Sequence, residues 1–272
     1  MIMNQKNKYE YLADFINNLR ANGRYTFTRE EVISQFDLGD EAYHKVIKRL
    51  QDKERISRIR QNFYVITPPE YAARKSLPFE YYIDDLMQYL DREYYVGMLT
   101  AAMYHGASHQ QPQRQFVVVE PPYLRPIENP TQSVIFCKKK RWNKRFIAQQ
   151  KTDAGYINIS NPSLTALDLV FYMDRIGGLN RAAEVLSELC AEIEPDNFRK
   201  AAEHFDQTTT LQRTGYLLGE ILGELEVSDV LFDVLQSRKY YPTLLRTDAE
   251  SDNMKAPNRW KVVPNIEVQI EP

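Results

Sequence analysis

The chain has 272 residues, 43% of them hydrophobic, with 35 lysines and arginines against 37 aspartates and glutamates. This composition predicts an ordinary globular protein of one or two domains and excludes a disordered or low-complexity chain. Two widely separated cysteines, Cys137 and Cys190, exclude a disulfide framework and a zinc knuckle, and no run approaches the roughly 20 apolar residues of a membrane span. We therefore expect a soluble, cytoplasmic protein without a membrane partner.

The first predicted elements are helices. Residues 9–19 place their apolar side chains on one face of a helix. A second helix begins after Thr28, because Glu31 three residues later completes a capping-box pattern. The segment 37–39 then forms a tight turn into a third helix, with Gly39 free to adopt a left-handed conformation.

The third helix divides into an apolar face and a basic face. Its apolar side chains recur at helical spacing: Tyr43, Val46, Ile47 and Leu50. The opposite face carries His44, Lys45, Lys48 and Arg49. Two strand-like runs follow at 55–60 and 63–67, and Gln61 and Asn62 between them predict a hairpin turn. Helix, turn, basic helix and hairpin in this order predict a winged helix-turn-helix, a DNA-binding fold.

The charge distribution agrees with this interpretation. Residues 1–75 hold 14 basic and 10 acidic side chains, whereas the remainder holds 21 and 27. Such a basic cluster suits phosphate contacts, although a basic helix face is also often simply solvated. We expect the third helix to enter the major groove and the wing to hold the DNA backbone. The predicted DNA contacts are Thr28, His44, Lys45, Lys48, Arg49, Arg58, Arg60, Gln61 and Asn62.

A boundary is expected within the proline-containing segment 67–78, which divides the chain into residues 1–75 and 76–272. In the second domain, residues 80–90 and 96–105 predict helices, and 115–119, 133–136 and 155–159 predict strands. Five further helices are expected at 163–175, 179–192, 196–206, 210–225 and 227–238. A last strand at 259–270 alternates well enough to return to the small sheet. The predicted fold class is α+β, a winged helix followed by a larger domain with a small sheet and a helical bundle.

Several segments along the chain resemble the AbiEi-type antitoxins of bacterial type IV (abortive infection) toxin–antitoxin systems. Residues 50–65 are similar to the end of the family's recognition helix and its basic wing, and residues 94–110 resemble the segment that opens its antitoxin domain. Four shorter stretches match later family features in the same order: 161–169, 177–179, 213–218 and 259–265. One position departs from the family. The wing turn there reads Arg-Gly, and here it reads Gln61-Asn62, which keeps the turn but removes one basic contact.

The resemblance implies a two-domain regulator. Its winged helix binds inverted repeats in the promoter of its own operon, and its C-terminal domain neutralises a cognate nucleotidyltransferase-like toxin. In type IV systems toxin and antitoxin need not touch, so no stable complex is implied.

The second domain contains a basic stretch of its own. Residues 137–151 include seven basic side chains and no acidic one, with Trp142 and Phe146 among them. This combination suits a second nucleic-acid contact or an acidic protein partner, and equally a solvated loop pinned by its aromatic residues. The candidate patch consists of Lys138, Lys139, Lys140, Arg141, Lys144 and Arg145.

Candidates for catalysis are weak. His105 and His109 have the spacing of a helical metal pair, but Gly106 replaces the glutamate of a zinc-protease motif, and a structural role is favoured. The adjacent Asp84 and Asp85 diverge on a helix, and Asp168 lies in an apolar run typical of a buried, hydrogen-bonded carboxylate. No glycine-rich phosphate loop is present. We expect no enzyme activity, no metal and no cofactor.

Two other classes of function remain open. A ligand-responsive transcription factor requires a sensor pocket in the second domain. A DNA-targeted nuclease requires clustered acids and a divalent metal, for which Glu120 and Asp153 are scattered candidates.

Overall fold

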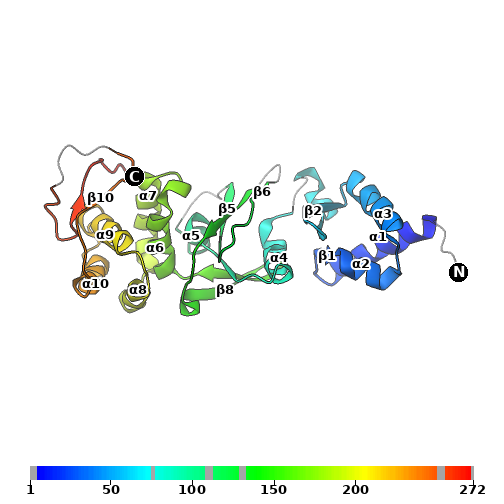
Figure 1. Ribbon diagram of the computed structural model, residues 1–272, viewed down its shortest axis with the longest axis horizontal. Coiled ribbons are helices and arrows are strands. Elements are labelled where there is room, and N and C mark those ends of the chain that lie inside the picture. The colour runs from blue at the N-terminus through cyan, green and yellow to red at the C-terminus, as the bar shows by residue number, and fades with distance from the viewer. Residues whose placement is uncertain (1–4, 75–76, 108–112, 129–132, 250–254, 271–272) are drawn as a thin grey trace.

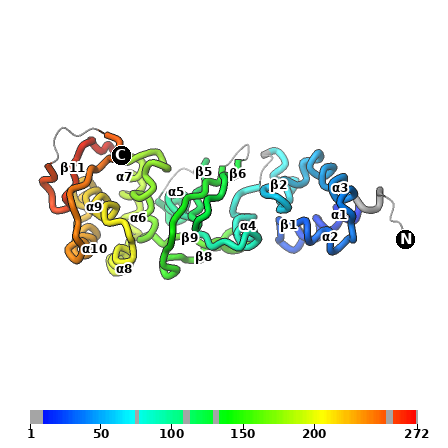
Figure 2. The backbone as a smooth tube through the Cα atoms, in the orientation of Figure 1, coloured from blue at the N-terminus to red at the C-terminus, as the bar shows by residue number. Residues whose placement is uncertain are grey.

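The computed structural model describes residues 5–74, 77–107, 113–128, 133–249 and 255–270. The chain has an α+β fold, as predicted, and its parts follow one another along the long axis of the molecule (Figure 1). Helices with a small sheet lie at the N-terminal end, a six-stranded sheet lies in the middle, and a group of helices lies at the C-terminal end. The backbone tube in Figure 2 shows the same order.

The N-terminal part contains three helices and a three-stranded antiparallel sheet. In chain order its elements are α1 (Gln5–Ala21), β1 (Thr26–Thr28), α2 (Arg29–Phe36), α3 (Asp40–Asp52), β2 (Ile56–Arg60) and β3 (Phe63–Ile66). The strands pair in the order β1-β3-β2. The predicted helices and hairpin are present, and β1 is an additional strand that the sequence analysis missed.

Local chemistry explains where α2 begins and ends. The hydroxyl of Thr28 accepts a hydrogen bond from the Glu31 N–H, and the Glu31 carboxylate accepts one from the Thr28 N–H at 2.7 Å, which confirms the capping box. The turn differs from expectation. Asp37 adopts the left-handed conformation (φ 45°), whereas Gly39 is extended (φ −67°) as the residue before α3. Aspartate tolerates this conformation better than most residues because its short polar side chain bonds locally.

The apolar face of α3 packs into the N-terminal core, as the periodicity predicted. Tyr43, Val46, Ile47 and Leu50 are all buried. They share one cluster with residues of α1, α2 and the sheet, and Phe27 stacks on Tyr64 with 5.2 Å between ring centroids. Burial of this face leaves the basic face of α3 in solvent.

The middle sheet is mixed and has the strand order β6-β7-β5-β4-β9-β8. Its strands are β4 (Tyr94–Val96), β5 (Arg114–Val119), β6 (Ile127–Glu128), β7 (Ser133–Lys138), β8 (Ile147–Thr152) and β9 (Gly155–Ser160). The predicted strands at 115–119, 133–136 and 155–159 are confirmed. Strands β4, β6 and β8 were not predicted. The helix predicted at 96–105 starts later, because α5 spans Met98–Tyr104 after strand β4.

The two faces of the sheet contribute to different clusters. Phe116 and Val118 belong to the large core formed with the C-terminal helices. Val117 and Val119, which alternate with them, belong to a second cluster with helix α4 (Ile83–Tyr89). This alternation is the normal consequence of the two-residue period of a strand.

The C-terminal part consists mainly of helices: α6 (Pro162–Phe171), α7 (Leu179–Leu189), α8 (Pro195–Glu203), α9 (Thr208–Tyr216) and α10 (Leu225–Gln236). All five predicted helices are present, and α9 continues into a π-helical turn, Leu217–Ile221. The predicted last strand is wrong. Within 259–270 only β11 (Val262–Val263) is a strand, and it pairs with β10 (Thr243–Leu244) rather than with the main sheet. Pro264 follows β11 directly and has no N–H for a ladder.

The N-terminal part is packed against the middle sheet. Phe63 and Val65 of β3 are buried in the same cluster as Phe79 and Tyr82. The hydroxyl of Thr26 also donates a hydrogen bond to the carboxylate of Asp85 in α4. The expected boundary segment contains a short 3₁₀ helix, Pro69–Arg74. The two parts therefore share apolar surface instead of being joined only by a linker.

Candidate nucleic-acid interface

The exposed face of α3 carries the basic residues that the sequence analysis selected. His44, Lys45, Lys48 and Arg49 are all exposed. Lys45 forms an ion pair with Glu41 at 2.6 Å one turn earlier, which partly neutralises it. An open groove runs between α3 and the β2–β3 hairpin, and it is lined by His44, Lys48, Gln51, Arg58 and Asn62, among others. A basic helix beside a groove offers lysine and arginine side chains to phosphates.

The hairpin turn has the geometry that its sequence favours. Asn62 has a φ of 61°, a conformation that asparagine tolerates better than most residues. Its carbonyl accepts a hydrogen bond from the Arg29 N–H at 2.9 Å. The carbonyl of Gln61 accepts one from the Tyr89 hydroxyl at 3.3 Å, so the tip contacts both α2 and α4. Arg58 on β2 is exposed.

Two of the residues predicted to contact DNA, Thr28 and Arg60, make polar contacts within the fold. Thr28 caps α2, as described above. The guanidinium of Arg60 lies 5.6 Å from the centre of the Phe136 ring and donates to the carbonyl of Arg125, and burial lowers the pKa of Arg60. Arg60 thus contacts the middle sheet, and it also lines the groove beside α3.

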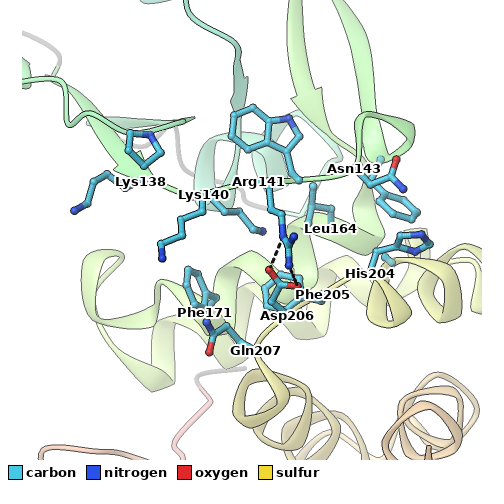
Figure 3. Close-up of a pocket in the computed structure, with 15 residues that line it drawn as sticks. Lys138, Lys140, Arg141, Asn143, Leu164, Phe171, His204, Phe205, Asp206 and Gln207 are labelled. Atoms are coloured by element: carbon cyan, nitrogen blue, oxygen red, sulfur yellow. Dashed lines mark hydrogen bonds and ion pairs between the residues drawn. The ribbon is translucent and has the colours of Figure 1, made fainter. Parts of the chain in front are cut away.

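The basic stretch 137–151 is divided by the structure into two surfaces. Lys138, Lys139, Lys140 and Arg141 line a pocket with Trp142 and Phe146 (Figure 3). Lys144 and Arg145 lie in a 3₁₀ turn, Lys144–Phe146, outside the lining of this pocket, and Lys144 is paired with Glu93. The stretch is not one loop, since it includes the end of β7 and most of β8.

Lys139 differs from its neighbours because it points inward. Its ammonium group lies 2.6 Å from the carboxylate of Asp168, which is fully buried, and 4.3 Å from the centre of the Phe205 ring. The Tyr95 hydroxyl donates to the other oxygen of Asp168 at 2.7 Å. Burial and the nearby carboxylate raise the pKa of Tyr95 well above its ordinary value. Asp168 is therefore the buried, hydrogen-bonded carboxylate that the sequence predicted.

The other chemical candidates have structural surroundings. The Nε2 of His105 donates to the Ser160 carbonyl at 2.7 Å, and burial lowers the pKa of His105. Its proposed partner His109 lies outside the described residues. Asp84 accepts a hydrogen bond from the Tyr94 hydroxyl at 2.9 Å, whereas Asp85 accepts the one from Thr26. Within the described residues no three histidine, cysteine or acidic side chains form a group suited to a metal ion.

Comparison with known proteins gives a similar fold for nearly the whole chain and a family match for its middle part. Across the described residues, no helix is long and apolar enough to cross a membrane. The crystal structure of the RV2827C protein from Mycobacterium tuberculosis has a similar fold, with a TM-score of 0.66 and 16% sequence identity over 93% of this chain and 90% of that chain. No curated protein matches the chain. Residues 95–220 match the family model of the AbiEi antitoxin C-terminal domain, which confirms for this part of the chain the resemblance seen in the sequence.

Proposed function

We propose that the chain is an antitoxin that also represses its own operon by binding DNA. In this proposal residues 1–75 form a winged helix-turn-helix domain and residues 76–272 form the antitoxin domain. The observation that carries the DNA-binding half is the exposed basic face of α3 beside the open groove that the β2–β3 hairpin borders. The antitoxin half is supported by the family match over residues 95–220.

Helix α3 is the proposed reading helix in the major groove. His44, Lys45, Lys48 and Arg49 are its contacts, and Arg58 with the turn residues Gln61 and Asn62 holds the wing to the backbone. Thr28 and Arg60 complete the proposed set, although both also have contacts within the fold: Thr28 caps α2, and Arg60 lies beside the Phe136 ring while lining the groove. The partner is double-stranded DNA with inverted repeats in the chain's own promoter.

The antitoxin domain acts on a cognate nucleotidyltransferase-like toxin encoded beside it, and the chain by itself performs no catalysis. Co-expression with the neighbouring gene tests this half. Growth restored by the full chain supports it, and toxicity that persists at equal expression contradicts it.

A titration on the chain's own upstream DNA tests the repressor half. We expect saturable binding that survives scrambled competitor DNA and weakens as the salt concentration rises. Lys48→Ala combined with Arg49→Ala should weaken binding by at least about tenfold, because charged contacts to DNA are removed.

The matched control also removes one lysine and one arginine, but in the C-terminal part of the chain, away from α3. Arg175→Ala with Lys239→Ala alters one arginine and one lysine that are exposed in the C-terminal part. This variant should bind like the unaltered chain. Binding by the α3 double variant at the affinity of the unaltered chain would refute the assignment of the reading helix.

A ligand-responsive regulator is the second candidate, favoured by the pocket of Figure 3. The two candidates differ in one measurement. A sensor changes its affinity for operator DNA when its ligand is added, whereas a plain autorepressor does not.

A further inference from the structure

The pocket between the β7–β8 connection and the C-terminal helices is separate from the proposed DNA contacts. It has a volume of 330 Å³ and is lined by residues of the 138–146 segment together with residues of α6, α8 and α9 or their ends (Figure 3). This volume falls within the range of about 300–1,000 Å³ typical of small-molecule sites.

The lining has a surplus of positive charge. It contains four cationic side chains: Lys138, Lys139, Lys140 and Arg141. Two of them are paired with carboxylates, Lys139 with Asp168 and Arg141 with Asp206 at 3.2 Å. Lys138 and Lys140 are exposed, and within the described part of the chain neither ammonium group has an ion-pair or hydrogen-bond partner. The two lysines lie at the same edge of the pocket in Figure 3. They are available to an anion.

A helix end adds to this potential. Helix α9 begins at Thr208, and the residue before it, Gln207, makes no side-chain capping hydrogen bond. Asp206 and Gln207 both line the pocket. The first N–H groups of a helix have no partner within it and attract phosphate groups.

The remaining wall is aromatic. Trp142, Phe171 and Phe205 all line the pocket. Trp142 packs its ring edge-on against Tyr95 with centroids 5.1 Å apart, which fixes its position. Aromatic side chains of this kind bind the flat face of a nucleobase by stacking.

From the cationic edge, the uncapped helix and the aromatic wall together, we propose that this pocket binds a nucleoside phosphate. The phosphates lie against Lys138, Lys140 and the start of α9, and the base lies against the aromatic wall. The buried Lys139–Asp168–Tyr95 network holds the floor in place. The ligand is a free nucleotide or the terminal nucleotide of a nucleic-acid strand, since both present the same groups.

Calorimetric titration of the full-length chain tests the proposal. The probes are ATP, adenosine, inorganic phosphate and a short 5′-phosphorylated single strand. We expect ATP to bind more tightly than adenosine or phosphate alone. Lys138→Ala with Lys140→Ala should weaken ATP binding by at least about tenfold, because two charged contacts to phosphate are lost.

The control variant comes from the same basic stretch. Lys144→Ala with Arg145→Ala removes the same charge outside the pocket lining, and it should bind ATP like the unaltered chain. Equal losses in both double variants would show only a general charge effect and would overturn the site. Absence of binding for both ATP and the strand, or equal affinity for ATP and adenosine, would also overturn it.

A second readout separates this site from the proposed DNA contacts. The chain has two tryptophans, and Trp260 is fully buried in the C-terminal part away from the pocket lining. ATP should therefore change the fluorescence of Trp142, and Trp142→Phe should abolish that change. The α3 double variant should keep the response, so a failed operator titration leaves this test intact. Binding of the strand without ATP assigns the pocket to a nucleic-acid end.

Discussion

Arg58 and Arg60 lie two residues apart on β2, yet their side chains have different surroundings. Regular alternation places both on one face, but the register shifts between them, with Arg58 opposite Tyr64 and Arg60 opposite Phe63. Such a bulge redirects the following side chain. Arg58 is exposed, whereas Arg60 contacts Phe136.

This difference predicts separate effects for two otherwise equivalent substitutions. Arg58→Ala should lower the slope of log affinity against log salt by about one and leave the melting temperature nearly unchanged. Arg60→Ala should change that slope less than Arg58→Ala does and destabilise the chain by about 1 kcal/mol, because it removes a cation–aromatic contact. Salt-dependent titration and thermal unfolding of both variants check this. Equal reductions of the salt slope in the two variants would contradict this difference.

Glu80 predicts a pH effect on stability. Burial raises the pKa of its carboxyl, and the charge of Asp153 adds to the rise. The folded chain therefore binds this proton more tightly than the unfolded chain does. The resulting stabilisation is complete below the ordinary pKa of about 4.3 and is lost as the pH rises through the folded pKa.

Glu80→Gln should accordingly be more stable than the unaltered chain at pH 7, and this advantage should vanish near pH 4. Melting temperatures at the two pH values measure it. Glu267→Gln, at an exposed position, is the control for the loss of one carboxylate. The same advantage for Glu80→Gln at both pH values would show that its charge is not the cause.

At the scale of elements, the close approach of α9 to the segment around Trp260 depends on one glycine. A Cβ added at Gly215 would lie 2.1 Å from the Trp260 ring, which is fully buried. The amide of Gln212, one turn earlier, donates to the Trp260 carbonyl at 2.8 Å and fixes the same contact. Helix and segment therefore meet at a position that accepts no side chain.

Gly215→Ala should destabilise the chain by about 1–3 kcal/mol, the usual cost of overpacking a core. Thr209→Ala on the exposed side of the same helix should have little effect. Chemical unfolding measures both. If the clash is the cause, the loss caused by Gly215→Ala should be smaller in a Trp260→Leu background, and an unchanged loss would point to the backbone of α9 instead.

The predictability of the elements follows from how local their signals are. The helices were predictable because the spacing of their apolar residues and their capping residues both lie within one continuous segment of sequence. Strand β4 has three residues, all buried, and shows no alternation, while β8 has no buried residue and resembles a polar loop. The segment 259–270, wrongly predicted as one strand, alternates well between apolar and polar residues. Alternation alone, however, does not ensure that a neighbouring strand is present to pair with it.

The same distinction applies to the candidate sites. The exposed face of α3 was predictable, because burying Tyr43 and Leu50 leaves Lys48 on the opposite side. The inward direction of Lys139 was not, because it depends on Asp168, 29 residues later. The pocket was equally hidden, since its walls come from distant segments of the chain.

For the whole molecule, the shared core between the N-terminal part and the middle sheet decides how the chain unfolds. Phe63 is 2% exposed and belongs to β3, yet it lies in the cluster of α4 and the sheet, with its ring 5.3 Å from that of Tyr89. Tyr25 likewise packs edge-on against Tyr81 at 4.9 Å. Apolar contact of this extent couples the stability of the two parts.

Phe63→Ala should therefore destabilise both parts together, by about 3–5 kcal/mol as for other buried phenylalanines. Tryptophan fluorescence reports only on the region after the expected boundary, because Trp142 and Trp260 both lie there. Hydrogen exchange of the α3 amides reports on the N-terminal part. Coupled unfolding shifts both signals to the same lower denaturant concentration in Phe63→Ala. Faster exchange in α3 with an unchanged fluorescence midpoint would mean that the N-terminal part unfolds independently, and that movement in α3 is not transmitted to the rest of the chain through this core.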